Sequence, residues 1–329
     1  MGRSWPPSSG SRRSLPTPLG ESAYAPRATR STSLLSPASG AAEATARRPA
    51  SPALRASRRS PPSSATSSLG AMPPRGLRPT GLVLVDKPAG PSSFAIVKRL
   101  RDRTGARAGH AGTLDPFASG LLLVLLGSST RLARYLVGLD KRYVTEIDLR
   151  ARTATGDIEG DVIEEREPPS AQELALRLAA LRGEIELPIP AASAVKIAGE
   201  RAYLLARRGE AVDMPRRRST IHDLVLHRYE VGVATIELEV SSGTYVRAIA
   251  DVLGGHCRSL RRTQVGPFSV EEADEERILP PLQALPFFPL VEVGEEEARA
   301  IRQGRKRVRD LVRVACAGEL VCVDGTVLP

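Results

Sequence analysis

One carboxylate, Asp115, lies in the glycine-rich segment 109–120, directly before an apolar run that predicts a buried strand. Glycines allow the backbone of such a loop to approach a ligand closely. Pro116 biases the backbone of Asp115 toward an extended conformation. An aspartate presented in this way can act as a covalent nucleophile. The same residues also occur in ordinary Asp-Pro turns, so the local pattern alone leaves both interpretations open.

The histidines and cysteines form no recognisable metal-binding pattern. The four histidines are scattered and the three cysteines lack CxxC spacing, so we predict no metal site. His256 and Cys257 are adjacent, but a single pair of ligands does not make a site. We expect the cysteines to be reduced thiols in a cytoplasmic protein.

No apolar run approaches the roughly 18 residues of a membrane span, and the first residues lack the apolar core of a secretory signal, so we expect no membrane association.

Short elements on both sides of Asp115 would hold this loop in place. Residues 81–85 form an apolar run before a turn, which predicts a strand. A helical pattern that follows Ser92 and includes Phe94 on its apolar side predicts a capped amphipathic helix. Residues 121–126 predict a buried strand. The loop is therefore expected to lie between elements that pack into one core.

The second half of the chain predicts further strands and helices. These are strands at 143–149 and 231–240, a capped helix at 170–181, a turn at 241–244 that leads into a helix with Arg247, and a C-terminal helix and β-hairpin. The chain is therefore expected to be α+β, with a mixed, mainly antiparallel sheet flanked by helices.

Residues 1–71 consist mostly of Ser, Pro, Ala, Arg and Gly, which cannot bury enough apolar surface to offset chain entropy. We expect 1–79 to be a disordered, low-complexity tail. Ten Arg and two Glu in 1–71 supply +8 of the net charge of +10, so net charge is weak evidence for a folded RNA-binding domain. Two alternatives stay open. The tail could be an organelle transit peptide, or translation could start at Met72, which the scarcity of Lys, typical of GC-rich coding DNA, favours.

Residues 81–280 resemble the TruB family of pseudouridine synthases. The 109–120 loop matches the signature G-H-x-G-x-L-D-P-x-A-x-G of that family. Further motifs follow in the order of the family: Asp86-Lys87-Pro88 with Gly90 and Ser92-Ser93, Lys141-Arg142-Tyr143, residues 153–160, residues 193–209, Gly243-Thr244-Tyr245-Val246-Arg247, and residues 260–268. Ala111, the 189–194 segment and Gln264 depart from the pattern; the second departure removes an aromatic residue beside the substrate channel.

The resemblance implies a pseudouridine synthase fold in residues 80–280 and a small PUA-like domain in 284–329. It implies isomerisation of a uridine in the tRNA T-loop, conventionally position 55, on a flipped-out base. The reaction breaks the bond between N1 and C1′, rotates the uracil and joins C5 to C1′, so it needs no cofactor and no metal. Asp115 is the implied nucleophile. Attack at C6 of the base and attack at C1′ of the ribose both stay open.

The resemblance also implies roles for five other residues. Arg247 would pair with the nucleophile, and its planar guanidinium can bind a carboxylate through two hydrogen bonds. Tyr143 would stack on the uracil and is a candidate for helping to deprotonate C5, with Tyr245 as a second aromatic near the site. His110 would occupy the space left by the flipped base, and Lys87 would order the loop or contact phosphate. From the residues alone, Tyr143 also fits a core aromatic, and His110 also fits a loop histidine hydrogen-bonded to backbone.

The expected partner is tRNA, bound by a monomer that acts without guide RNA. Two alternatives are an RNA-binding or tRNA-folding module with secondary catalysis, and a guide-RNA-dependent relative. The short C-terminal region and the bacterial character of the motifs argue against the second alternative. The 284–329 segment itself could contact RNA or serve only as a packing appendage.

Overall fold

The computed structural model describes residues 78–193, 195–197, 199–202, 208, 214–308, 312–324 and 326–328. The predicted tail up to residue 77, the alternative start at Met72 and most of the 203–209 stretch lie outside these residues. In the part that the structure describes, no helix combines the length and the apolar character needed to span a membrane.

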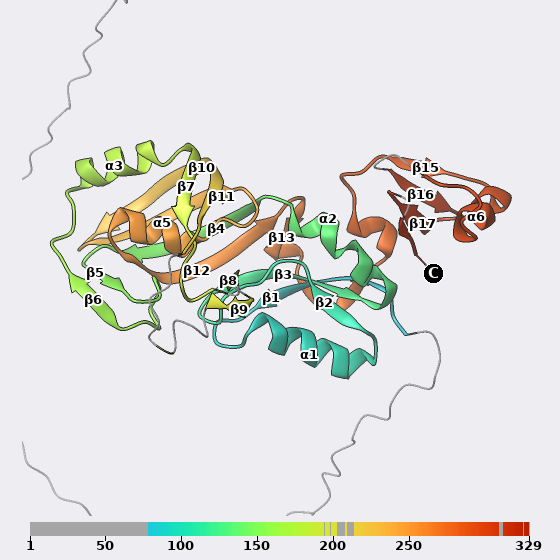
Figure 1. Cartoon of the computed structure of the whole chain (residues 1–329), viewed down its shortest axis with the longest axis horizontal. Helices are drawn as coiled ribbons and strands as arrows, with labels where there is room; N and C mark the ends of the chain where they lie inside the picture. Colours follow the sequence, from blue (N-terminus) through green and yellow to red (C-terminus); the bar gives the residue numbers. More distant parts are fainter. Residues whose placement is uncertain are drawn as a thin grey trace, which may run out of the picture. The chain divides into compact units, whose positions relative to one another are not determined.

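A mainly antiparallel sheet forms the centre of the described chain (Figure 1). Its strand order is β14-β1-β3-β12-β4-β11-β10-β7, with β2 beside β3 and β13 beside β12. The strands are β1 (Gly81–Lys87), β2 (Ala108–His110), β3 (Ser119–Leu126), β4 (Lys141–Asp148), β7 (Gly183–Pro188), β10 (Arg216–Glu230), β11 (Val233–Val240), β12 (His256–Val265), β13 (Phe268–Ser269) and β14 (Asp274–Leu279). The predicted fold class is confirmed.

Among the described strands of this sheet, only β3 and β12 pair in parallel. Arg261 lies opposite Ser119, and Arg262 lies opposite Gly120. This short join connects one half of the sheet, β14-β1-β3, to the other half, β12-β4-β11-β10-β7. Gly120 permits the close approach, because its φ is +102° and a Cβ there would lie 2.2 Å from the carbonyl oxygen of Arg262.

The first half of the sheet follows its sequence patterns closely. Residues 121–126 of β3 are fully buried, and α1 (Ser93–Thr104) begins after Ser92, whose hydroxyl accepts a hydrogen bond from the amide of Ala95 at 3.2 Å. Phe94 was expected on the apolar side but is 64% exposed. The helix turns about 100° per residue, so the face that packs inward includes Leu100 and leaves Phe94 in solvent. That detail of the prediction was wrong.

In the second half, α3 (Ala171–Ala180) and α5 (Val246–Leu253) pack against each other, α3 also contacts β10, and α5 also contacts β7 and β12. Ser170 caps α3 by accepting a hydrogen bond from the amide of Glu173 at 3.2 Å, as predicted. The shorter elements are β5 (Ala151–Thr153) paired with β6 (Val162–Glu165), β8 (Lys196–Ile197) paired with β9 (Glu200–Arg201), α2 (Ala133–Val137), and the 3-10 helices Gly127–Leu132, Val270–Glu272 and Pro281–Ala284.

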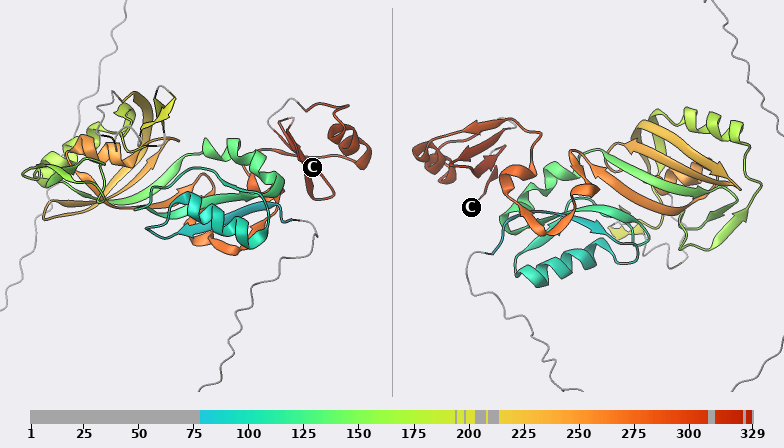
Figure 2. Two further views of the ribbon diagram at one scale, coloured as in Figure 1. Left: turned by 60° about the horizontal axis from the view of Figure 1, so that its bottom comes forward. Right: turned by 180° about the vertical axis from the view of Figure 1, so that it is seen from behind.

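A second sheet lies near the C-terminus (Figure 2, red). It contains β15 (Leu290–Glu292), β16 (Arg313–Cys316), β17 (Glu319–Val323) and β18 (Thr326–Val327), and α6 (Glu295–Arg302) packs on it. Its own core includes Ala298, Ile301 and Val314. Leu320 and Val323 instead belong to a cluster with residues of β1 and β3. The 284–329 boundary and the PUA-like character of this unit stay predictions.

Candidate active site

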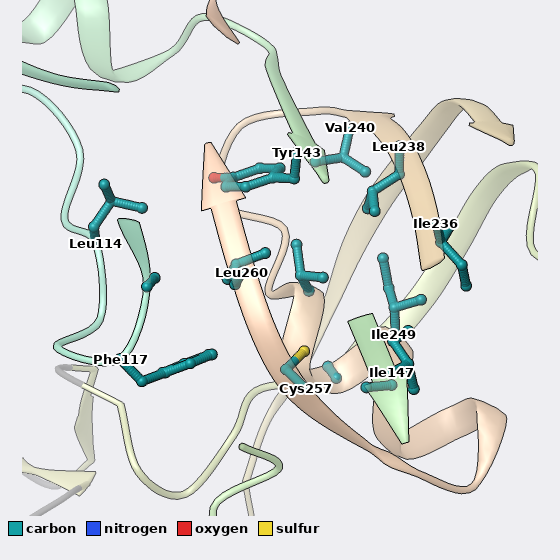
Figure 3. Close-up of a cluster of buried hydrophobic side chains, with 14 of the residues drawn as sticks. Leu114, Phe117, Tyr143, Ile147, Ile236, Leu238, Val240, Ile249, Cys257 and Leu260 are labelled. Atoms are coloured by element: carbon teal, nitrogen blue, oxygen red, sulfur yellow. The ribbon is translucent and has the colours of Figure 1, made fainter. Parts of the chain in front are cut away.

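The loop between β2 and β3 brings Asp115 to a pocket of about 370 Å³. Tyr143 of β4 lines this pocket, together with Tyr245 and Arg247 from the start of α5. Part of the lining is apolar and belongs to the largest core cluster: Leu114, Tyr143, Val246 and Leu260 are members of both. Figure 3 labels Leu114, Tyr143 and Leu260 among the side chains of this cluster. The site therefore combines one carboxylate with an aromatic and apolar surface.

Asp115 is held by a buried arginine. Its Oδ2 accepts a hydrogen bond from Nε of Arg247 at 2.8 Å. The side chain of Arg247 is 3% exposed and that of Asp115 is 33% exposed. A bond through two nitrogens was considered from the sequence, but the structure shows one. Both terminal nitrogens are used elsewhere, since Nη1 donates to the carbonyl of Thr155 at 2.7 Å and Nη2 to that of Ala192 at 3.0 Å.

A second carboxylate, Asp157, lies behind the arginine. Its Oδ2 is 3.5 Å from Nη1 of Arg247, and its side chain is buried. Its Oδ1 accepts hydrogen bonds from the hydroxyl of Thr155 at 2.5 Å and the amide of Glu159 at 3.1 Å. Arg247 thus faces one carboxylate open to the pocket and one buried beneath it. Asp157 was not predicted as a site residue, although it lies in the 153–160 motif, which was the available signal.

Lys87 lies fully buried and supports the loop that carries Asp115. Its Nζ donates to the carbonyls of Pro88 at 2.9 Å, Pro91 at 2.8 Å and Pro116 at 3.2 Å. Burial lowers the pKa of Lys87, and the nearby Asp115 carboxylate partly opposes this effect. Lys87 is not among the residues that line the pocket. Of the two roles considered for it, ordering of the loop is the one that fits its contacts.

Arg262 of β12 supports the same loop from another direction. Its side chain is almost fully buried. Nε donates to the carbonyl of Leu121 at 2.8 Å, Nη2 to that of Gly112 at 3.1 Å and Nη1 to that of Thr113 at 3.4 Å. Arg262 was recognised in the sequence only as part of the 260–268 motif. Its contacts join residues far apart in the chain, so no local pattern could indicate them.

Lys141, at the start of β4, is a further buried cation of the pocket. Its Nζ donates to the carbonyl of Val137 at 2.7 Å, to the carbonyl of Leu139 and to the hydroxyl of Ser242 at 3.3 Å. Burial lowers the pKa of Lys141 to about 8, and the positive charge of Arg262 adds to this effect.

His110 lies apart from the other predicted site residues. It ends β2, where it pairs with Val124 of β3, and it does not line the pocket. Burial and the charge of Arg262 lower the pKa of His110, and in the described part of the chain its Nδ1 has no hydrogen-bond partner. The structure therefore gathers Asp115, Tyr143, Tyr245 and Arg247 around one pocket and leaves Lys87 and His110 outside its lining.

Residues 98–246 match the family described as TruB family pseudouridylate synthase (N terminal domain). Several curated relatives are named tRNA pseudouridine synthase B. That of Leifsonia xyli subsp. xyli is 43% identical, and the match covers 72% of this chain and 83% of the relative. That of Arthrobacter sp. is 42% identical, with 69% and 82% covered. That of Thermobifida fusca is 39% identical, with 69% and 86% covered.

Two solved structures share the fold. The crystal structure of a Cbf5-Nop10-Gar1 complex has a TM-score of 0.56 at 23% sequence identity, over 74% of this chain and 77% of that chain. The structure of an H/ACA RNP bound to a substrate RNA containing 2′-deoxyuridine has a TM-score of 0.55 at 22% identity, with 74% and 77% covered. At these identities the likeness concerns the fold alone.

Proposed function

The chain belongs to the TruB family of pseudouridylate synthases, and from this premise we propose that it isomerises one uridine in the T-loop of tRNA, the position conventionally numbered 55. The predicted family and the prediction of an isomerase acting on tRNA are confirmed by relatives named tRNA pseudouridine synthase B that align with about 70% of the chain. The T-loop site, the nucleophile and the cofactor-free route are proposals.

One observation carries the choice of Asp115 as the nucleophile. Arg247 holds Oδ2 of this carboxylate, while in the described chain Oδ1 accepts no hydrogen bond. The carboxylate is thus oriented through one oxygen and has the other available for attack. A preorganised nucleophile of this kind needs little rearrangement when the substrate enters.

The apolar and aromatic lining supports a flipped uracil as the occupant. A base taken out of its stack loses contacts with its neighbours, and an aromatic surface replaces part of them. Tyr143 offers such a surface beside Leu114 and Leu260. Attack of Asp115 at C6 of the base and attack at C1′ of the ribose both fit this arrangement.

The reaction itself requires only a positioned carboxylate and proton transfer. The bond between N1 and C1′ breaks, the uracil rotates within the pocket, and C5 bonds to C1′. C5 then loses its proton and N1 gains one, so substrate and product have the same composition. Nothing is oxidised or reduced, and we propose that no cofactor takes part.

We propose action without guide RNA. The relatives at 39–43% identity are named as tRNA enzymes, whereas the likeness to the ribonucleoprotein structures stays at 22–23% identity. We further propose that residues 80–280 are the catalytic domain and that 284–329 form a PUA-like appendage, which the separate core of Ala298, Ile301 and Val314 supports.

Carbodiimide mapping of pseudouridine on an unmodified tRNA transcript tests the proposal. Wild type should give one reverse-transcription stop, at the T-loop uridine. Asp115→Asn keeps the size of the side chain but removes the nucleophile, so kcat should fall by roughly 10⁴-fold or more. Asp102→Asn, which changes an exposed carboxylate on α1, is the matched control and should retain activity.

Two outcomes would contradict the proposal. A stop at a different uridine would reject the T-loop assignment. Turnover by Asp115→Asn at the wild-type rate would reject the nucleophile. Binding of the same tRNA by Asp115→Asn, measured by filter retention, shows that the variant is folded and separates a loss of chemistry from a loss of binding.

A further inference from the structure

The pocket contains one arginine whose charge no described residue neutralises. Arg217 of β10 lines the pocket together with Asp115 and Arg247, and its side chain is exposed. Its one hydrogen bond, from Nη1 to the carbonyl of Gly243, is long at 3.5 Å. Within the described residues it takes part in no ion pair. A guanidinium has five N–H donors, so most of those of Arg217 are free.

The other cations of the pocket have their donors occupied. Arg247 donates to Asp115 and to two carbonyls, Arg262 to three carbonyls, and Lys141 to two carbonyls and a hydroxyl. Their positions are therefore fixed by the protein itself. Arg217 is the pocket cation, among the described residues, that is free to bind something from outside.

The alternation of β10 directs Arg217 toward the site. Ser219 and Ile221 are buried, and Arg217 shares their face of the strand because successive side chains alternate. Arg218 lies on the opposite face, is exposed, and does not line the pocket. Gly243 leaves room for the guanidinium: its φ is +80°, and a Cβ there would lie 2.6 Å from Nη1 of Arg217. The glycine and the arginine therefore form one surface at the pocket.

A nucleotide whose base enters the pocket brings its two phosphodiesters close to the opening. Each carries one negative charge, and the base stays attached to them through the ribose. An exposed guanidinium without a carboxylate partner suits phosphate oxygens, because charge-assisted hydrogen bonds to them are strong and match its fork. We propose that Arg217 binds a phosphodiester that flanks the flipped uridine and so holds the nucleotide while the detached uracil rotates. This inference rests on the proposed function.

The test combines variants of the protein with changes in the RNA. The substrates are a T-arm stem-loop and two versions of it in which a neutral methylphosphonate replaces the phosphate on the 5′ or the 3′ side of the target uridine. The proteins are wild type, Arg217→Gln, Arg217→Lys and Arg218→Gln. Kd is measured in the Asp115→Asn background, and KM and kcat are measured with Asp115 intact.

We expect Arg217→Gln to raise Kd and KM by roughly 10- to 100-fold, the range of a hydrogen bond to a charged group. Arg217→Lys should recover part of the loss. Arg218→Gln removes the same charge from the other face and should change Kd by less than about threefold. One methylphosphonate should weaken binding by wild type by a similar factor and should weaken binding by Arg217→Gln no further, which is the coupling expected for a direct contact.

The proposal would be overturned if the methylphosphonates weakened binding by Arg217→Gln as much as they weaken binding by wild type. It would also be overturned if Arg217→Gln and Arg218→Gln raised Kd equally. A failure of the proposed function would look different. In that case wild type would leave the uridine unchanged in the stem-loop and in intact tRNA, while the Kd measurements would still report whether Arg217 contacts a flanking phosphate.

Discussion

The loop that carries Asp115 contacts two regions that use cations in different ways. In the first region, Lys87 and Arg262 are buried and direct their hydrogen bonds to backbone carbonyls. Across the pocket, Arg247 binds the carboxylate of Asp115, and Arg217 keeps most of its donors free. The first region, the loop support, fixes the backbone. The second region, the pocket wall, holds the carboxylate of Asp115 and presents free donors to the pocket.

This difference shows that a buried cation near an active site need not touch the substrate. The acceptor decides its role. A carbonyl that loses its donor costs local stability, whereas a carboxylate that loses its counter-charge changes the chemistry available at the site. Variants of the loop support and of the pocket wall should therefore differ in whether stability or turnover changes most.

The largest effect is expected for Arg247→Met. This change leaves Asp115 without its orienting partner and Asp157 buried without a counter-charge. Removal of one partner from a buried pair costs about 3–5 kcal/mol of unfolding free energy. We expect kcat to fall by roughly 10²- to 10⁴-fold as well, because an equal loss of about 3–5 kcal/mol in the transition state has that size. Urea unfolding and single-turnover kinetics measure the two losses. If kcat of Arg247→Met stayed within tenfold of wild type, the expectation that pocket-wall variants lose turnover would be contradicted.

A smaller effect, mainly on stability, is expected for Arg262→Lys. The amine keeps the charge but cannot reach three carbonyls with the geometry of a guanidinium. We expect a loss of about 2–3 kcal/mol in unfolding free energy, a moderate fall in kcat and an unchanged KM for tRNA. Arg261→Lys is the matched control. Arg261 is the neighbour of Arg262 on β12, but its side chain is 42% exposed and pairs with Asp86. A raised KM with unchanged stability would place Arg262 in the pocket wall instead.

The smallest effect concerns Lys141, which lines the pocket yet donates to carbonyls. Burial lowers its pKa from 10.5 to about 8, so between these values the unfolded chain binds the proton more tightly than the folded protein does. Unfolding free energy should therefore rise with pH, by about 1 kcal/mol between pH 7 and pH 9. Lys141→Met should lack this rise. The difference between the two proteins in urea unfolding across this pH range measures it. Equal pH dependence in both would contradict the lowered pKa.

The sequence indicated the parts of the site that local patterns can encode. The apolar run of β3, the Ser92 cap of α1 and the glycine-rich loop with Asp115 were all predicted from neighbouring residues. The resemblance of its motifs to those of the family further indicated Tyr143, Tyr245 and Arg247, which line the same pocket.

The rest depends on contacts between distant residues. Arg262 reaches Gly112 across 150 positions, and Asp157 reaches Arg247 from a turn between two short strands, β5 and β6. Periodicity within one element carries no information on such contacts. The same limit explains Phe94, because the face that a helix buries is chosen by the sheet it packs on and not by its own apolar residues alone.

The short parallel join between β3 and β12 also determines when the site can form during synthesis. Lys87 and Ser93 contact the loop from 29 and 21 positions away, so these contacts can form soon after the loop leaves the ribosome. Arg262 is synthesised about 150 residues after Gly112. At ribosomal speeds of roughly 5–20 residues per second, its contacts with the loop therefore form many seconds after those of Lys87 and Ser93. Throughout that time the nascent chain carries Asp115 in a loop supported on one side only. The loop with Asp115 therefore acquires its full set of supporting contacts only after β12 has been synthesised.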